Sequence, residues 1–190
     1  MSEIFFEIQE GNFTASKINK VNNVNLIIKD QGEIVSLLGP SGIGKTTILR
    51  TIAGLQKLTK GKIKLRGKTL ASDQIHIEPE KRNVALSFQD NSLFPNYSVI
   101  DNINFGVKRS NGNSSSIKVK EIIELLRIEP ILNKFPHQFS AGEAQRVSLA
   151  RSLMSKPDLL LLDEPFSNID QSFKEEIQVS VKKLLKRINL

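Results

Sequence analysis

Eight consecutive residues have the types and spacing of a phosphate-binding loop: Gly39, Pro40, Ser41, Gly42, Ile43, Gly44, Lys45 and Thr46. They match the pattern G-x-x-x-x-G-K-[ST] at every fixed position. Glycines let such a loop curl so that backbone N–H groups point at phosphate oxygens. Lys45 brings a full charge to the β- and γ-phosphates, and the Thr46 hydroxyl can ligate Mg²⁺. The sequence therefore predicts a site for ATP with Mg²⁺, with Thr47 as the next residue of the binding set.

A pair of acids follows four consecutive leucines later in the chain. Residues 159–162 are all leucine, as in a buried strand, and Asp163 and Glu164 come directly after them. At a strand end, Asp163 would lie near Mg²⁺, and Glu164 would orient and deprotonate a water that attacks the γ-phosphate. The alternative is two solvated acids in a turn, against which the phosphate loop upstream argues. We therefore predict Asp163 as a metal ligand and Glu164 as the catalytic base.

The elements that must position these residues follow from the apolar pattern. The continuous apolar run at 34–38, directly before the phosphate loop, suits a strand covered on both faces. The other predicted strands are 4–8, 24–28, 84–88, 159–162 and a two-stranded antiparallel piece within 61–70. The predicted helices are 45–53, 117–128, 143–155 and 171–190, with a polar loop at 108–116. Strands that alternate with helices predict an α/β fold with a mainly parallel sheet.

Composition narrows the class of protein. The 190 residues suit one domain, and 39% hydrophobic with 25% charged residues is typical of a globular protein. No cysteine is present, which excludes disulfides and thiolate metal sites, and two histidines argue against a histidine-rich one. No apolar run approaches the ~20 residues of a membrane-spanning helix, and the acidic N-terminus does not resemble a signal peptide. A cytosolic location is the default expectation.

The net charge of +7 allows two interpretations. One is binding to nucleic acid, and the other is a lysine-rich surface beside an anionic ligand or lipid. The basic residues are scattered, apart from Lys182, Lys183, Lys186 and Arg187 near the end. Because no basic stripe is apparent, we predict no nucleic-acid partner.

Three further segments carry a resemblance to a known family. Residues 139–147 (FSAGEAQRV) resemble the LSGGQ signature and the QRV that follows it. Residues 88–90 (FQD), followed by Leu-Phe-Pro at 93–95, resemble the Q-loop, and 167–170 (SNID) resemble the D-loop. With the phosphate loop and the acid pair, this set in this order resembles the nucleotide-binding subunit of an ABC transporter over nearly the whole chain.

The resemblance implies a fold and a set of roles. The fold is a P-loop NTPase core, formed by 1–89 and 156–190 with an N-terminal antiparallel β part, and an inserted helical subdomain at 90–155 that carries the signature. Gln89 would bind Mg²⁺, act in catalysis and sense the membrane domains, and Asp170 would link two ATP sites across a dimer. An aromatic residue upstream of the phosphate loop would stack on adenine; Phe13 is the candidate, with a core phenylalanine as the alternative.

The signature segment has a physical interpretation of its own. Ser140 and Glu143 form S-x-x-E, a capping box that opens a helix, and a helix start is an anion site. In the family, Ser140, Ala141 and Gly142 would contact the γ-phosphate of ATP bound to a second copy in a head-to-tail dimer, and Glu143 would complete the binding set. An ordinary capped helix is the alternative. Relative to LSGGQ, Ala141 adds a methyl group and Glu143 adds a negative charge.

The end of the chain departs from the family pattern. The resemblance implies a further strand and a switch-loop histidine at a position beyond Leu190, and His76 and His137 lie elsewhere. The sequence therefore predicts a C-terminally truncated cassette that lacks both features.

The leading functional hypothesis is an ATPase subunit of a bacterial importer. Its expected partners are a second copy of itself, transmembrane permease subunits and a solute-binding protein, at the cytoplasmic face of the inner membrane. The motifs most resemble importers of ferric iron, thiamine or spermidine, with ferric iron or thiamine preferred. The alternatives are a soluble, non-transport ABC ATPase of DNA repair or ribosomes, and a truncated nucleotide-binding protein with little hydrolysis.

Overall fold

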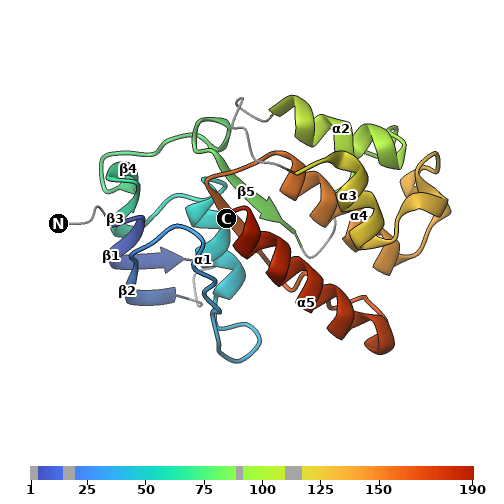
Figure 1. The fold of residues 1–190 in the computed structure, drawn as a ribbon. Coiled ribbons are helices and arrows are strands. Elements are labelled where there is room, and N and C mark those ends of the chain that lie inside the picture. The colour runs from blue at the N-terminus through green and yellow to red at the C-terminus, as the bar shows by residue number, and fades with distance from the viewer. Residues whose placement is uncertain (1–3, 15–19, 89–91, 110–116) are drawn as a thin grey trace. The chain divides into compact units, whose positions relative to one another are not determined.

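The computed structural model describes residues 4–14, 20–88, 92–109 and 117–190, and Figure 1 shows the elements that they form. Its contacts divide the chain into two compact units. The first comprises Met1–Val84 with Asn189, and the second comprises Ala85–Ile188 with Leu190. Each unit is described by itself below. The division of the sequence into a core and a helical subdomain at 90–155 stays a prediction.

The first unit contains a four-stranded antiparallel sheet in the order β2-β1-β3-β4. Its strands are β1 (Phe6–Thr14), β2 (Lys20–Ile28), β3 (Lys60–Leu65) and β4 (Lys68–Ser72). Phe6, Ile8 and Ile63 are at most 2% exposed and form part of its core. The predicted strands at 4–8 and 24–28 and the antiparallel piece within 61–70 are confirmed, with longer strands than the apolar runs indicated.

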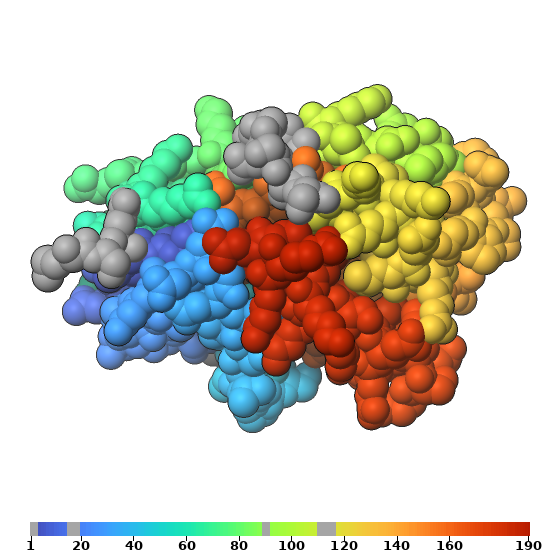
Figure 2. All heavy atoms as spheres, viewed as in Figure 1, coloured from blue at the N-terminus to red at the C-terminus, as the bar shows by residue number. Residues whose placement is uncertain are grey.

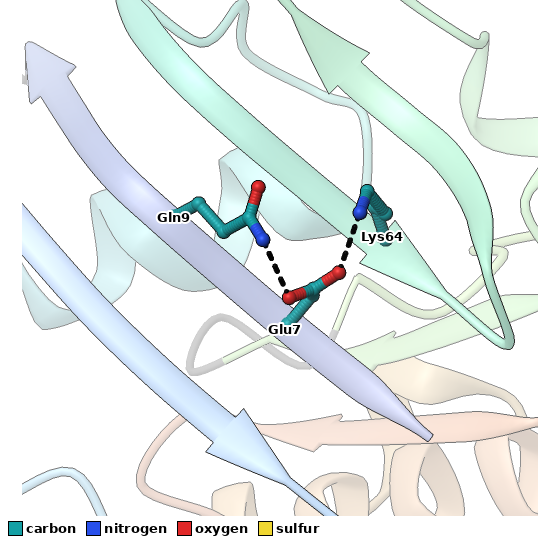
Figure 3. Close-up of polar contacts among 3 residues, drawn as sticks. All are labelled: Glu7, Gln9 and Lys64. Carbon is teal, nitrogen blue, oxygen red and sulfur yellow. Dashed lines mark hydrogen bonds and ion pairs between the residues drawn. The ribbon is translucent and has the colours of Figure 1, made fainter. Parts of the chain in front are cut away.

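A partly buried ion pair joins the two central strands of this sheet (Figure 3). Glu7 on β1 lies directly opposite Lys64 on β3, and the Lys64 Nζ donates to Glu7 Oε1 over 2.7 Å. Gln9 Nε2 donates to Glu7 Oε2 over 2.8 Å. The hydrogen bond from Lys64 is the main reason why the pKa of Glu7 lies below 4.5, since it stabilises the carboxylate.

This pair predicts an acid-sensitive contribution to stability. A carboxyl group with a lowered folded-state pKa stabilises the fold above its unfolded pKa, and the contribution is lost as pH falls through the folded value. We expect Glu7→Gln to lower the free energy of unfolding at pH 7, with the difference from the parent shrinking between about pH 5 and about pH 3. Urea denaturation across this pH range measures it. Glu80→Gln, at an exposed position of the same unit, is the control. A difference that does not depend on pH would contradict the assignment.

Helix α1 (Lys45–Ile52) follows the phosphate loop and packs on β1. Its buried face consists of Thr47, Ile48, Thr51 and Ile52, which confirms the predicted helix at 45–53. Gly54, with φ +87°, lies just beyond its end. A 3-10 turn, Pro79–Lys81, precedes the end of the unit.

The strand predicted at 34–38 is not present. These five residues are all described, and none of them belongs to a strand. Ile34, Val35 and Leu38 are 47%, 44% and 92% exposed. An apolar run forms a strand only if the backbone of another strand pairs with it, and the run itself does not specify that partner. The sheet of the first unit closes with β2 and β4 at its edges and leaves 34–38 outside its ladder.

The described residues of the second unit form a two-stranded sheet, whose first strand begins at Val84, and four α-helices. Its elements are β5 (Val84–Ser87), β6 (Leu159–Leu162), α2 (Val99–Arg109), α3 (Val119–Leu126), α4 (Ala141–Met154), α5 (Gln171–Arg187), and the 3-10 turns Glu129–Ile131 and Pro136–Gln138. α4 packs against α2 and α3. α3 also packs against α5, and Figure 2 shows the yellow atoms of α3 beside the red atoms of α5. Two ion pairs, Arg127–Glu176 and Arg187–Glu121, join α3 and its C-cap residue to α5.

The sequence predicted three of these four helices. The predictions at 117–128, 143–155 and 171–190 are confirmed, as are the strands at 84–88 and 159–162. Helix α2 was not predicted, although Val99, Ile103 and Gly106 form a buried face with helical spacing. Of the polar loop predicted at 108–116, residues 110–116 lie outside the described residues, and 108 and 109 end α2. In the described part of the chain, no helix combines the length and apolarity needed to cross a membrane.

Candidate nucleotide-binding site

The phosphate loop adopts a backbone that only glycines reach easily. Gly42 has φ +79° and Gly44 has φ +106°, both in the left-handed region. A Cβ at Gly44 would also lie 2.4 Å from Val21 Cγ2 of β2, which is closer than two carbons can approach. Gly44 is the N-cap residue of α1, so the loop leads directly into the positive end of a helix. This geometry supports the predicted phosphate site.

The side chain of Lys45 folds back over the phosphate loop. Its Nζ donates to the carbonyl oxygens of Gly39 and Pro40 over 2.7 and 2.8 Å. Residues 39–43 are exposed, while Thr46 is half-buried and Thr47 is buried. The loop therefore presents its backbone and one cation to solvent, where a triphosphate can reach them.

The opposite end of α1 is held by a buried arginine that the sequence did not single out. Arg82 is 2% exposed, and its Nη1 donates to the carbonyl oxygens of Thr51 and Ile52 over 2.8 and 2.9 Å. Its Nε donates to Ile77 O over 2.6 Å. Burial lowers the pKa of Arg82 to about 10. A cation at these last carbonyls satisfies them and opposes the negative end of the helix.

In the second unit, the acid pair ends β6 as predicted. Asp163 is 7% exposed, and its N–H donates to Ser87 O at the end of β5 over 3.1 Å. Glu164 is exposed and has φ +46°, a left-handed backbone that is strained for a residue other than glycine. The strand thus ends in a sharp turn at the predicted base.

The capping box predicted from Ser140 and Glu143 is present at the start of α4. Ser140 N–H and Oγ donate to Glu143 Oε2 over 2.8 and 2.9 Å, and the Glu143 N–H donates to Ser140 Oγ over 3.2 Å. The backbone N–H of Ser140 is the largest cause that lowers the pKa of Glu143. Ser140 and Ala141 are exposed. The signature therefore forms a capped, accessible helix start.

The signature also touches the segment that follows the acid pair. A Cβ on Gly142 would lie 2.6 Å from the carbonyl oxygen of Asn168, so a side chain at this position would collide with backbone. Asp170, predicted to link two sites, is the exposed N-cap residue of α5. The second unit thus brings the signature and the D-loop segment into contact.

The structure does not support the predicted role of Phe13, and it does not describe Gln89. Phe13 is 0% exposed and its ring lies over Gly11, which matches the alternative interpretation as a core phenylalanine. A fully buried ring has no free face on which adenine could stack. Gln89 lies outside the described residues.

The donor set for Mg²⁺ is small. Among the described residues, no group of three or more His, Asp or Glu side chains could hold a metal ion. Mg²⁺ at phosphates needs few protein ligands, since one or two side-chain oxygens join phosphate oxygens and water. The Thr46 hydroxyl and the Asp163 carboxylate are donors of the right kind.

Sequence reasoning missed the roles of Arg82 and Gln145. Gln145, within the QRV part of the signature resemblance, is 1% exposed and bonds the segment after Glu164. A polar residue whose position in the predicted helix falls on its buried face is a signal for such contacts, because a buried amide must be hydrogen-bonded. No comparable periodicity marks Arg82, which lies in an irregular segment.

Comparison with known proteins agrees with this geometry. The family model described as ABC transporter matches residues 21–167. The spermidine/putrescine import ATP-binding protein of Nitrosospira multiformis is 43% identical over 182 residues, 95% of this chain and 47% of the relative. The Fe(3+) ions import ATP-binding protein of Escherichia coli O157:H7 is 40% identical, over 90% of this chain and 48% of its own length. The chain thus spans about half the length of these curated relatives.

Solved structures give the same fold. An ATP-binding cassette solved as a dimer in a post-hydrolysis state with ADP and Pi has a TM-score of 0.79 and 28% identity, over 97% of this chain and 84% of that one. A component of an ABC transporter complex from Clostridium perfringens has a TM-score of 0.75 and 25% identity, over 98% and 76% of the two chains. The predicted α/β P-loop fold is confirmed. The phosphate loop, the acid pair, the capped signature helix and these matches place the chain in the ABC transporter family.

Proposed function

We propose that this chain binds and hydrolyses ATP as the energy-supplying subunit of a bacterial importer for a small solute. The observation that carries the proposal is the capped signature helix in contact with the D-loop segment, since a phosphate loop alone indicates only phosphate binding. The names of the relatives, which are import ATP-binding proteins, support it.

The residues have separable tasks at the nucleotide. The loop N–H groups, Lys45 and the N-terminus of α1 bind the phosphates. Thr46, Asp163 and Gln89 would hold Mg²⁺, which when bound neutralises charge on the β- and γ-phosphates. Glu164 orients the attacking water and accepts its proton.

The signature acts on the nucleotide of a second copy. Ser140, Ala141, Gly142 and Glu143 form a helix start whose first two residues are exposed, so that it can receive a γ-phosphate. Solved neighbours that are dimeric support pairing with a second copy, and the arrangement that we propose for the pair is head-to-tail. The Glu143 carboxylate accepts both donors of Ser140, so ATP must compete with it for the Ser140 hydroxyl.

The permease subunits and the solute-binding protein complete the proposed importer, with this chain at the cytoplasmic face of the inner membrane. Ferric iron or thiamine is the solute that we put first. Relatives named for Fe(3+) import support iron, whereas others carry the names of spermidine/putrescine and maltose/maltodextrin.

The test is co-purification of the tagged chain, in the longest form that its gene encodes, with membrane proteins from its own host. An importer subunit is expected to bring down a permease pair, and ATP hydrolysis is expected to rise when the loaded solute-binding protein is added. Capture of DNA or ribosomes instead would favour the soluble ABC ATPase. The chain contains no histidine after His137, so residues 138–190 cannot supply a switch-loop histidine, and the longest form is the proper subject.

A further inference from the structure

A buried glutamine joins the signature helix to the turn that carries the proposed base. Gln145 lies on α4 and is 1% exposed. Its Nε2 donates to Glu164 O over 2.8 Å and contacts Ser167 Oγ at 3.2 Å. The N–H of Asn168 donates to Gln145 Oε1 over 3.0 Å. One side chain thus bonds three residues of the segment from 164 to 168.

The chemistry of the partners fixes which way the Gln145 amide faces. A backbone carbonyl only accepts, so the atom beside Glu164 O must be the NH₂ group. A backbone N–H only donates, so the atom beside Asn168 N must be the amide oxygen. The two contacts agree on one orientation, and neither could form with the amide reversed. The arrangement therefore requires a group that both donates and accepts.

The hydrogen bond from Gln145 Nε2 is made to Glu164, the residue of the turn with the strained backbone. Glu164 has φ +46°, and such a backbone persists only where its surroundings hold it. Its carbonyl oxygen also accepts from the Ser167 N–H over 3.2 Å, within the turn itself. The bond from Gln145 comes from outside the turn, from a helix nineteen residues earlier in the chain. It fixes the peptide plane from which the Glu164 side chain projects.

We infer that Gln145 is a positioning residue for Glu164, an inference that rests on the proposed function. Its side chain holds the 164–168 segment in the one backbone conformation in which Glu164 is directed for proton abstraction. Gln145 lies two positions after Glu143 on α4, the helix that Ser140 caps. The proposed γ-phosphate contact at Ser140 and the hydrogen bond to the turn at Glu164 therefore both come from this helix. Gly142, against Asn168 O, adds a second contact between the same two segments.

The test removes the NH₂ donor of Gln145 and keeps the shape of its side chain. Gln145→Glu retains the side-chain length and an oxygen for the Asn168 N–H, but it sets a carboxylate oxygen against Glu164 O. We expect kcat for ATP hydrolysis to fall roughly 10- to 100-fold, because a small misplacement of a reacting group costs on this order. The KM for ATP and nucleotide binding to the phosphate loop should change less than about twofold, since neither involves Gln145. Gln178→Glu makes the same chemical change at an exposed position of α5 and should leave both constants unchanged.

Further measurements separate positioning from folding and from failure of the proposed function. Gln145→Met removes all three hydrogen bonds without placing a charge in the interior, and it should show the same loss of kcat with ATP binding retained. A parallel loss of ATP binding and thermal stability in both variants would overturn the inference in favour of a merely structural role. Glu164→Gln is measured beside them. If it slows hydrolysis while both Gln145 variants turn over normally, the inference fails and the proposed base stands; if it does not slow hydrolysis, the proposed base itself fails.

Discussion

Replacing Lys45 by alanine is expected to abolish ATP binding. The ammonium group lies across the phosphate loop, held by the carbonyl oxygens of Gly39 and Pro40, where the β- and γ-phosphates would lie. Its removal takes away the one full charge that the loop directs at the triphosphate. We expect affinity for ATP to fall by more than about 100-fold, which is about 2.8 kcal/mol. Equilibrium titration with a fluorescent ATP analogue measures the change.

The fold should survive this substitution. The two carbonyl groups that lose Lys45 are exposed, so water replaces its hydrogen bonds without a buried group left unpaired. Thermal unfolding without nucleotide should therefore match that of the parent. Lys57→Ala, at an exposed position in the same unit, is the matched control and should bind ATP normally. Parental ATP affinity in Lys45→Ala would refute the assigned role of the loop.

Local signals decided which elements could be predicted. The capping box at Ser140 and the helical spacing of α3 and α5 depend on residues three or four positions apart, so the sequence carries them directly. The segment 34–38 failed because strand formation depends on partners elsewhere in the chain, which an apolar run does not identify. Phe13 failed as an adenine platform for a related reason, since a sequence does not tell on which face of a sheet a ring is covered.

The features of the candidate site also separate into local ones, which the sequence predicts, and those that depend on distant residues. The phosphate loop and the acid pair were predicted because their residue types and spacing are local. The left-handed backbone of Glu164 was not predicted, since glycine usually marks such a position and here a glutamate occupies it. The bonds of Gln145 to the 164–168 segment join residues nineteen or more positions apart. Only the folded second unit shows that the signature helix and the segment from 164 to 168 are in contact.

The second large effect is expected at Glu164. Glu164→Gln removes the carboxylate that we propose as the acceptor of a proton from the attacking water, and a positioned general base contributes about 10²–10⁴-fold. In the longest form of the chain, we therefore expect hydrolysis at saturating ATP to slow by about this factor. ATP binding should persist, because the phosphate loop is untouched. Release of phosphate measures the first quantity and nucleotide titration the second.

Glutamine is the right substitute because it removes the negative charge of residue 164 and keeps the backbone conformation. Glutamate and glutamine have nearly the same size and are equally strained at φ +46°, so the turn and its hydrogen bond from Gln145 should be retained. Glu175→Gln, at an exposed position on α5, controls for loss of one negative charge. Slow hydrolysis with intact binding should also let the ATP-bound dimer accumulate, because in the proposed dimer a second copy completes each site at Ser140. Size-exclusion chromatography detects this dimer. Full turnover in Glu164→Gln would reject Glu164 as the base and would leave the acid pair only its proposed metal-binding role at Asp163.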